Sequence, residues 1–117
     1  MPDVYDIDNL NVLRDLQASH GNSLIVLYVG LAGVAQGTYD VYRDIAQRTN
    51  PIGPNHRQII FAYHNIDLNA SIQTAYGGTS IPTVVMFHGD SVVGRLDDLS
   101  ERVLEKYIRK NAEEEEK

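Results

Sequence analysis

The order of apolar and polar residues along the first half of the chain predicts alternating strands and helices. Residues 4–7 alternate weakly and predict a short edge strand, and Leu10, Leu13 and Leu16 then repeat with helical spacing within residues 8–19. Asp8 is expected to cap this helix. Residues 24–29 form an unbroken apolar run that is rich in β-branched residues and too short for a typical helix. This run predicts a central strand that is buried on both faces.

The rest of the chain continues this alternation and then changes to a hairpin. Residues 34–48 have helical spacing, residues 58–63 predict a second strong strand, and residues 68–76 predict a short helix that ends at two glycines. Two apolar runs, 83–87 and 92–96, flank a short glycine-containing turn and predict a β-hairpin. Ser100 is expected to cap a last amphipathic helix.

The element order β-α-β-α-β-α-β-β-α predicts the fold class. It combines a parallel βαβ half with an antiparallel hairpin, so we expect an α/β fold with a mixed central sheet of four to five strands and four flanking helices. We assign residues 1–111 to one domain and residues 112–117 to an acidic tail. Four consecutive glutamates at the end of a helix are unfavourable, and we expect this tail to be disordered.

Composition narrows the classes of function. The chain has 117 residues, 43% of them hydrophobic, and a net charge of −6 from ten Lys and Arg against 16 Asp and Glu. An acidic chain lacks the positive field that nucleic-acid binding requires. No apolar run is long enough to span a membrane, and the first residues do not resemble a secretory signal. We therefore expect a cytoplasmic protein that binds neither nucleic acid nor membrane.

The absence of cysteine removes several kinds of chemistry. With no cysteine in the sequence, disulfides, thiolate zinc sites and thiol catalysis are excluded. The four histidines are too scattered to indicate a metal site. A glycine-rich segment, residues 30–37, follows a predicted strand, but it has neither the G-x-G-x-x-G spacing nor the Lys-Ser/Thr pair of a phosphate-binding loop. We expect no metal and no cofactor.

A group of residues in the second half carries a family resemblance. These residues are Tyr76-Gly77-Gly78-Thr79-Ser80-Ile81-Pro82-Thr83, then Phe87-His88-Gly89-Asp90 and Leu99-Ser100. Together with the element order, they resemble the thioredoxin-like family over about residues 10–108. The resemblance implies that the bond between Ile81 and Pro82 is cis and that Pro82 faces the active site. Such a bond is uncommon outside sites that need it.

The family's Cys-x-x-Cys motif falls on Ala32-Gly33-Val34-Ala35. The resemblance implies that Ala32 and Ala35 occupy the catalytic positions, where two thiols would exchange with a disulfide. Two explanations remain open. The alanines are a double replacement in a parent thiol–disulfide oxidoreductase that acts on protein disulfides, or the chain is a naturally redox-inactive interaction module. In either case the chain as given is redox-inactive.

Other family positions also differ. The resemblance places the family's buried acid on Val26, its lysine partner on Tyr63 and its helix-kinking proline on Asp40. Without the acid, the usual proton acceptor for the buried thiol is missing, so even a restored dithiol should work differently from a typical thioredoxin.

The resemblance also implies an apolar face on which an extended segment of a protein partner docks. Its residues are Tyr28, Leu31, Gly33, Val34, Ile81 and Pro82. For Tyr28, its position inside a buried strand favours the alternative interpretation, that it is a core residue. Asp97, at a family glycine on this face, and its neighbour Asp98 either favour basic partners or are solvated turn residues. Nothing in the sequence indicates the oligomeric state.

Overall fold

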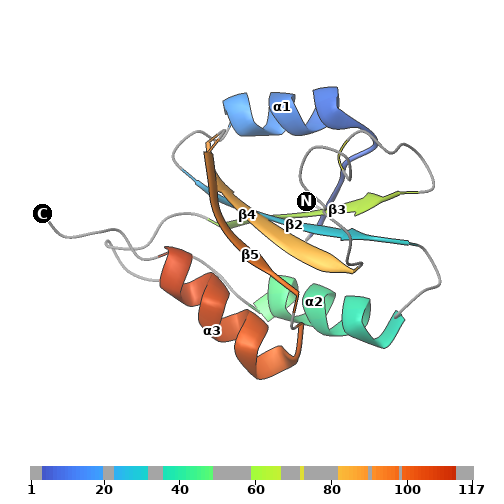
Figure 1. The fold of residues 1–117 in the computed structure, drawn as a ribbon, viewed down its shortest axis with the longest axis vertical. Helices are drawn as coiled ribbons and strands as arrows, with labels where there is room; N and C mark the ends of the chain where they lie inside the picture. The colour runs from blue at the N-terminus through green and yellow to red at the C-terminus, as the bar shows by residue number, and fades with distance from the viewer. Residues whose placement is uncertain are drawn as a thin grey trace, which may run out of the picture.

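The structure is a computed structural model, and it describes residues 4–19, 23–31, 36–48, 59–66, 72, 82–89, 91–97 and 99–112. Its elements, in chain order, are β1 (Tyr5–Asp6), α1 (Leu10–Ser19), β2 (Leu24–Gly30), α2 (Gln36–Arg48), β3 (Ile59–Asn65), β4 (Thr83–His88), β5 (Ser91–Leu96) and α3 (Glu101–Ala112). Figure 1 shows their arrangement.

The five strands form one mixed sheet in the order β1-β3-β2-β4-β5. β1 pairs with β3 and β3 with β2 in parallel, whereas β4 is antiparallel to both β2 and β5. The predicted parallel half and hairpin half are therefore confirmed, and β1 is an edge strand as predicted. In the turn of the hairpin, Gly89 has a φ of 64°, a left-handed conformation that glycine adopts without steric cost.

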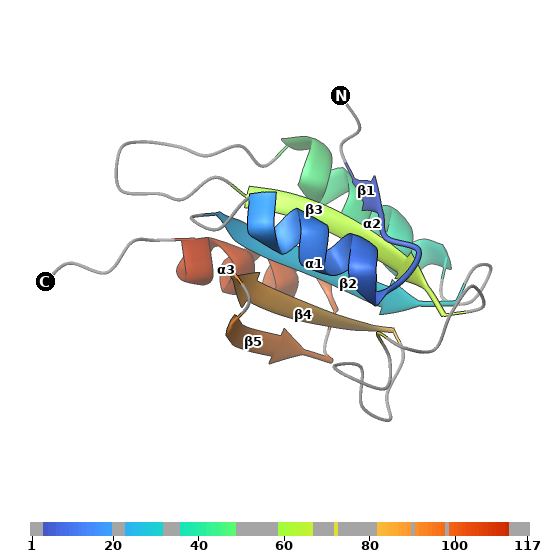
Figure 2. The same cartoon turned by 90° about the horizontal axis from the view of Figure 1, so that it is seen from above.

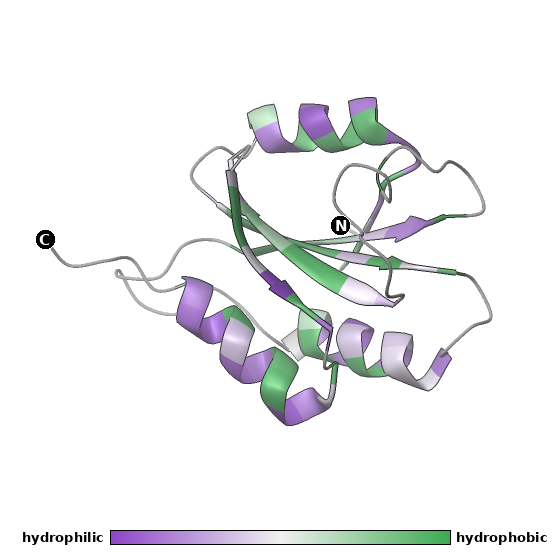
Figure 3. Ribbon diagram, in the orientation of Figure 1, coloured by the Kyte–Doolittle hydropathy of each residue, from purple (hydrophilic) through white to green (hydrophobic). Residues whose placement is uncertain are grey.

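Helices cover both faces of the sheet. Figures 1 and 2 show α1 on one face and α2 and α3 on the other. β2, in the centre of the sheet, is buried along its whole length, and its side chains point alternately to the two faces. Ile25, Leu27 and Val29 belong to the core under α1, while Leu24, Val26 and Tyr28 belong to the core under α2 and α3. Figure 3 shows the hydrophobic residues concentrated on the central strands.

Three of the four predicted helices fall within the described residues. Of the fourth, predicted over residues 68–76, the structure describes Ile72, which is helical and fully buried in the core under α1. Among the helices that the structure describes, none has the length and apolar character required to cross a membrane.

One predicted helix cap needs correction. Asn9 caps α1, because its Oδ1 accepts a hydrogen bond from the backbone N–H of Val12 at 3.1 Å; Asp8, the predicted cap, lies one residue too early for this geometry. α3 runs through Ala112, the first residue of the predicted acidic tail, and the rest of that tail, residues 113–117, lies outside the described residues. The side chain of Ala112 is 1% exposed in the core, and this burial holds the last turn of α3 against the sheet.

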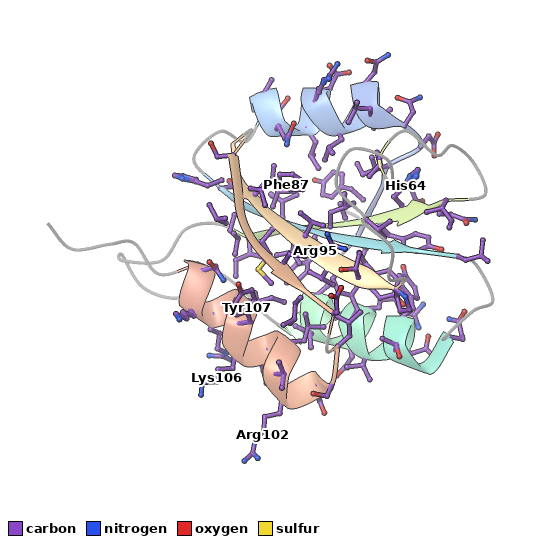
Figure 4. All side chains as sticks on the ribbon, in the orientation of Figure 1. His64, Phe87, Arg95, Arg102, Lys106 and Tyr107 are labelled. Atoms are coloured by element: carbon purple, nitrogen blue, oxygen red, sulfur yellow. The ribbon has the colours of Figure 1, made fainter. Side chains whose placement is uncertain are left out.

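Gly94 allows α3 to approach β5 closely. A Cβ at this position would lie 2.9 Å from Oη and 3.0 Å from Cε2 of Tyr107, which is closer than real Cβ atoms normally approach. Figure 4 shows Tyr107 on the side of α3 that faces β5. The absence of a side chain at Gly94 thus makes room for the ring that packs α3 on the sheet.

Replacing Gly94 by alanine is expected to lower the free energy of unfolding by about 1–3 kcal/mol, because the added methyl group overpacks this contact. Urea denaturation followed by circular dichroism measures the change. Gly37, in α2, is the matched control, since a Cβ there would meet nothing within 4 Å. Gly37→Ala should leave the free energy unchanged or raise it by less than about 1 kcal/mol. Equal losses for the two variants would contradict the close packing of Tyr107 on Gly94.

Candidate functional site

The candidate site lies at the edge of the sheet where β2 and β5 end and β4 begins. Gly30, Pro82 and Leu96 are at or next to these strand ends. A Cβ on Gly30 would lie 2.7 Å from Cε1 of Tyr28 and 3.6 Å from Cβ of Pro82. Gly30 therefore fits between the ring of Tyr28 and Pro82, and a larger residue would push the ring away.

The structure describes three of the residues that the sequence assigned to this site. Leu31 and Pro82 are partly exposed. Tyr28 is 1% exposed, so its side chain forms the floor of the site within the core and is not part of an open docking surface. Ala32, Gly33, Val34, Ala35 and Ile81 lie outside the described residues, as does the predicted cis bond before Pro82.

Four tyrosines pack against one another beneath this edge, and we call them the tyrosine cluster: Tyr28, Tyr39, Tyr42 and Tyr63. Tyr28 and Tyr63 are register partners on the parallel strands β2 and β3, and their ring centroids lie 5.8 Å apart. The rings of Tyr39 and Tyr42, from α2, lie 5.3 Å and 5.1 Å from that of Tyr28. Tyr39 also lies 4.7 Å from Tyr63. These separations are typical of favourable aromatic pairs.

The hydroxyl of Tyr42 binds the backbones of two strands. Its oxygen lies 2.9 Å from the carbonyl oxygen of Val26 in β2 and 2.6 Å from that of Ala62 in β3, and it accepts the N–H of Ala62 at 3.1 Å. Because a hydroxyl has a single proton, the two carbonyl oxygens share it. This fully buried side chain thus connects α2 to the two central parallel strands.

The hydroxyl of Tyr28, unlike that of Tyr42, is buried without a hydrogen-bond partner among the described residues. Burial, followed by the neighbouring Tyr63 and Tyr39, raises the pKa of Tyr28 to about 12. Burial also raises the pKa of Tyr42 well above its usual value, although its backbone hydrogen bonds oppose this effect. Both hydroxyls therefore stay protonated near neutral pH.

The residues beneath this edge determine whether a proton acceptor is available there. Val26 is 0% exposed and packs in the same core as the cluster, at the position that the resemblance assigned to a buried acid. Tyr63 stands at the position assigned to a lysine. Tyrosines that remain protonated supply no proton acceptor near neutral pH. Tyr28 and Tyr42 therefore offer no general base beneath the site near neutral pH.

The residue after Pro82, Thr83, carries a hydroxyl that forms a polar contact beside the site. Thr83 is fully buried, and its Oγ1 donates to Oδ1 of Asp97 at 2.7 Å, with the carbonyl oxygen of Leu96 at 3.2 Å. Nε of Arg95 lies 3.9 Å from the same Oδ1 of Asp97. The side chain of Asp97 is 57% exposed. A buried hydroxyl thus orients an exposed carboxylate at the end of β5.

His64, at the end of β3, has a structural contact. Its side chain is fully buried, and Nδ1 lies 2.6 Å from the carbonyl oxygen of Ile7, so this nitrogen carries the donated proton. The contact ties the segment after β1 to β3. Within the described residues, no three His, Asp or Glu side chains gather in a way that would hold a metal ion.

Comparison with known proteins identifies the fold. No protein-family model matches the chain, and no curated protein matches it in sequence. Solved structures do match: a mutant thioredoxin from Halobacterium salinarum has a TM-score of 0.75 at 21% identity, with 99% of this chain and 96% of that chain covered. The thioredoxin of Fasciola hepatica has a TM-score of 0.79 at 19% identity, covering 92% and 98%. The chain has a thioredoxin fold.

A thioredoxin from Schistosoma mansoni extends the comparison, with a TM-score of 0.77 at 17% identity over 92% of this chain and 94% of that chain. The thioredoxin fold predicted from the sequence is therefore confirmed. The chain has this fold without any cysteine, so it cannot carry out dithiol chemistry by itself.

The sequence predicted a site around Pro82 but not the tyrosine cluster beneath it. Seven tyrosines and no tryptophan, with Tyr39 and Tyr42 three residues apart on a predicted helix, were the available signal. The contact of these two with Tyr28 and Tyr63 depends on the parallel register of β2 and β3, which one sequence does not specify. The role of Thr83 was missed for the same reason, because Asp97 lies opposite it only after β4 and β5 pair.

Two conservative variants test the tyrosine cluster. Tyr42→Phe is expected to lower the free energy of unfolding by about 1–3 kcal/mol, because backbone groups of Val26 and Ala62 lose a buried partner. Tyr28→Phe, its matched control, removes a hydroxyl that has no partner among the described residues, and the free energy should stay the same or rise by up to about 1 kcal/mol. Chemical denaturation at neutral pH measures both. A loss at Tyr28 as large as that at Tyr42 would contradict these hydroxyl environments.

Proposed function

We propose that the chain is a redox-silent thioredoxin-fold module that binds an extended segment of a partner polypeptide at the edge around Pro82. The observation that carries the proposal is a thioredoxin fold with no cysteine, in which tyrosines occupy the floor of the site. What remains at this edge is a partly exposed apolar surface that includes Leu31 and Pro82. Proteins commonly recognise extended peptides through backbone hydrogen bonds, together with pockets that select side chains.

The aromatic floor favours this module over a simply inactivated enzyme. Replacing two cysteines by alanine would leave the supporting acid and lysine of an oxidoreductase in place. In this chain both supporting positions are uncharged, and Tyr63 contacts Tyr28 and Tyr39 in a packed core. Replacement of two cysteines alone would therefore not account for the residues beneath this site.

Selection from a library of random twelve-residue peptides displayed on phage tests the proposal. We expect binders whose synthetic forms shift the backbone amide resonances of Gly30, Leu31 and Thr83 in NMR titrations. The amides at the C-terminal end of α1, which lie near the start of β2 at the opposite end of the sheet, are the internal control and should not move. Failure to select any binder, or shifts confined to other surfaces, would contradict the proposed site.

A second candidate function rests on the paired alanines. Alanine at both motif positions, Ala32 and Ala35, is the pattern that replacement of two cysteines in an oxidoreductase leaves behind. In that case the natural partner is a protein disulfide, and these two positions supply the nucleophilic and the resolving thiol.

Installing cysteine at positions 32 and 35 together separates the two candidates. For the binding module, we expect a dithiol that does not turn over a model protein disulfide, because Val26 takes the place of the buried acid beneath it. A reversible disulfide with a reduction potential between about −270 and −120 mV, together with turnover, would favour the oxidoreductase instead. The variant with cysteine at position 32 alone is the control for simple mixed-disulfide formation.

A further inference from the structure

The carboxylate of Asp97 is held in position at the edge where the proposed partner binds. Its Oδ1 accepts a 2.7 Å hydrogen bond from Thr83, whose side chain is fully buried and so cannot turn to solvent. Thr83 follows Pro82 directly in the chain, which places the carboxylate next to the proposed binding edge. An acidic group that is already oriented loses less side-chain entropy when it pairs than a freely rotating one.

The remaining oxygen of Asp97 is available to a partner. Oδ2 has no hydrogen bond or ion pair among the described residues, and the side chain is 57% exposed. Arg95 approaches Oδ1 at 3.9 Å, with both side chains well exposed, and such exposed pairs contribute little. Figure 4 shows Arg95 extending from β5. A second cation therefore finds an acceptor that Arg95 does not occupy.

The net charge of the chain also favours a cationic partner segment. Its net charge of −6 attracts cationic segments and repels acidic ones before contact. At physiological salt this long-range field decays over about 8 Å. A carboxylate held at the site therefore has more influence than net charge on which residue of the partner binds next to it.

We propose that Asp97, positioned by Thr83, makes the edge around Pro82 selective for a partner segment that carries a lysine or arginine. This inference rests on the proposed function, because it names the chemistry of the segment that binds there. Asp97 is the residue that contacts the partner's cation, and Thr83 is a positioning residue that acts through Asp97.

The same phage library of random twelve-residue peptides tests the selectivity when it is panned in parallel against four proteins. These are the wild-type chain, Asp97→Asn, Thr83→Val and Asp15→Asn. Asp15 is the matched control, an exposed carboxylate on α1 whose replacement makes the same change in net charge. We expect Lys and Arg to be enriched about threefold at a fixed position by the wild type and by Asp15→Asn. The enrichment should be lost with Asp97→Asn and reduced with Thr83→Val.

A selected peptide then measures the interaction between Asp97 and the basic residue of the peptide. Replacing its basic residue by glutamine should weaken binding to the wild type about threefold, the size expected for an exposed ion pair. The same replacement should have no effect on binding to Asp97→Asn. Thr83→Ser should restore wild-type affinity, and Thr83→Val should add nothing in the Asp97→Asn background. A merely structural role for Thr83 would weaken all peptides equally, whatever their charge.

The outcomes distinguish the two levels of the proposal. Binders that shift Gly30 and Leu31 but show no basic enrichment would overturn the charge selectivity while the proposed function stands. If Asp15→Asn lowers the enrichment of basic residues as much as Asp97→Asn does, the enrichment comes from net charge. That result would also overturn the role of Asp97. Failure to select any binder would overturn both.

Discussion

The buried hydroxyl of Tyr42 is the interaction on which the arrangement of this molecule depends. A single oxygen from α2 contacts backbone atoms of β2 and β3, the two central parallel strands. Because the side chain is fully buried, these contacts have no competition from water. They fix the position of α2 against the sheet, and with it the rings of Tyr39 and Tyr42 that pack on Tyr28.

This packing also limits what the site can do. In an oxidoreductase with this fold, the space beneath the motif has to manage protons as well as support the backbone. Here the hydroxyls of Tyr28 and Tyr42 have raised pKa values, so neither serves as a proton acceptor near neutral pH. The hydroxyl of Tyr28 is buried without a hydrogen-bond partner among the described residues. The proposed recognition of a polypeptide segment rests on this aromatic floor and on the oriented carboxylate of Asp97 beside it.

Most of the fold was predictable because it depends on local patterns. The apolar run at residues 24–29 predicted a strand buried on both faces, and β2 is such a strand. The glycine-containing turn predicted the hairpin of β4 and β5 for similar reasons. The predicted cap at Asp8 was wrong by one residue, since Asp and Asn have similar capping tendencies and adjacent positions compete.

The site was less predictable because its contacts join residues far apart in the sequence. Tyr42 reaches residues 16 and 20 positions away, and Thr83 reaches a residue 14 positions away across the hairpin. Hydrophobic periodicity identified Tyr42 as a core residue of a helix, but it does not reveal which backbone atoms its hydroxyl meets. The family resemblance located the edge around Pro82, whereas the tyrosines that distinguish this chain required the structure.

The hydroxyl of Tyr42, buried and shared by β2 and β3, is expected to fix α2 and the tyrosine cluster beneath the site. NMR detection of the hydroxyl proton of Tyr42 tests this role. We expect a slowly exchanging hydroxyl proton with nuclear Overhauser contacts to the amide proton of Ala62 and to the ring of Tyr28. A hydroxyl proton that exchanges rapidly with water, or the absence of contacts to Ala62, would contradict it.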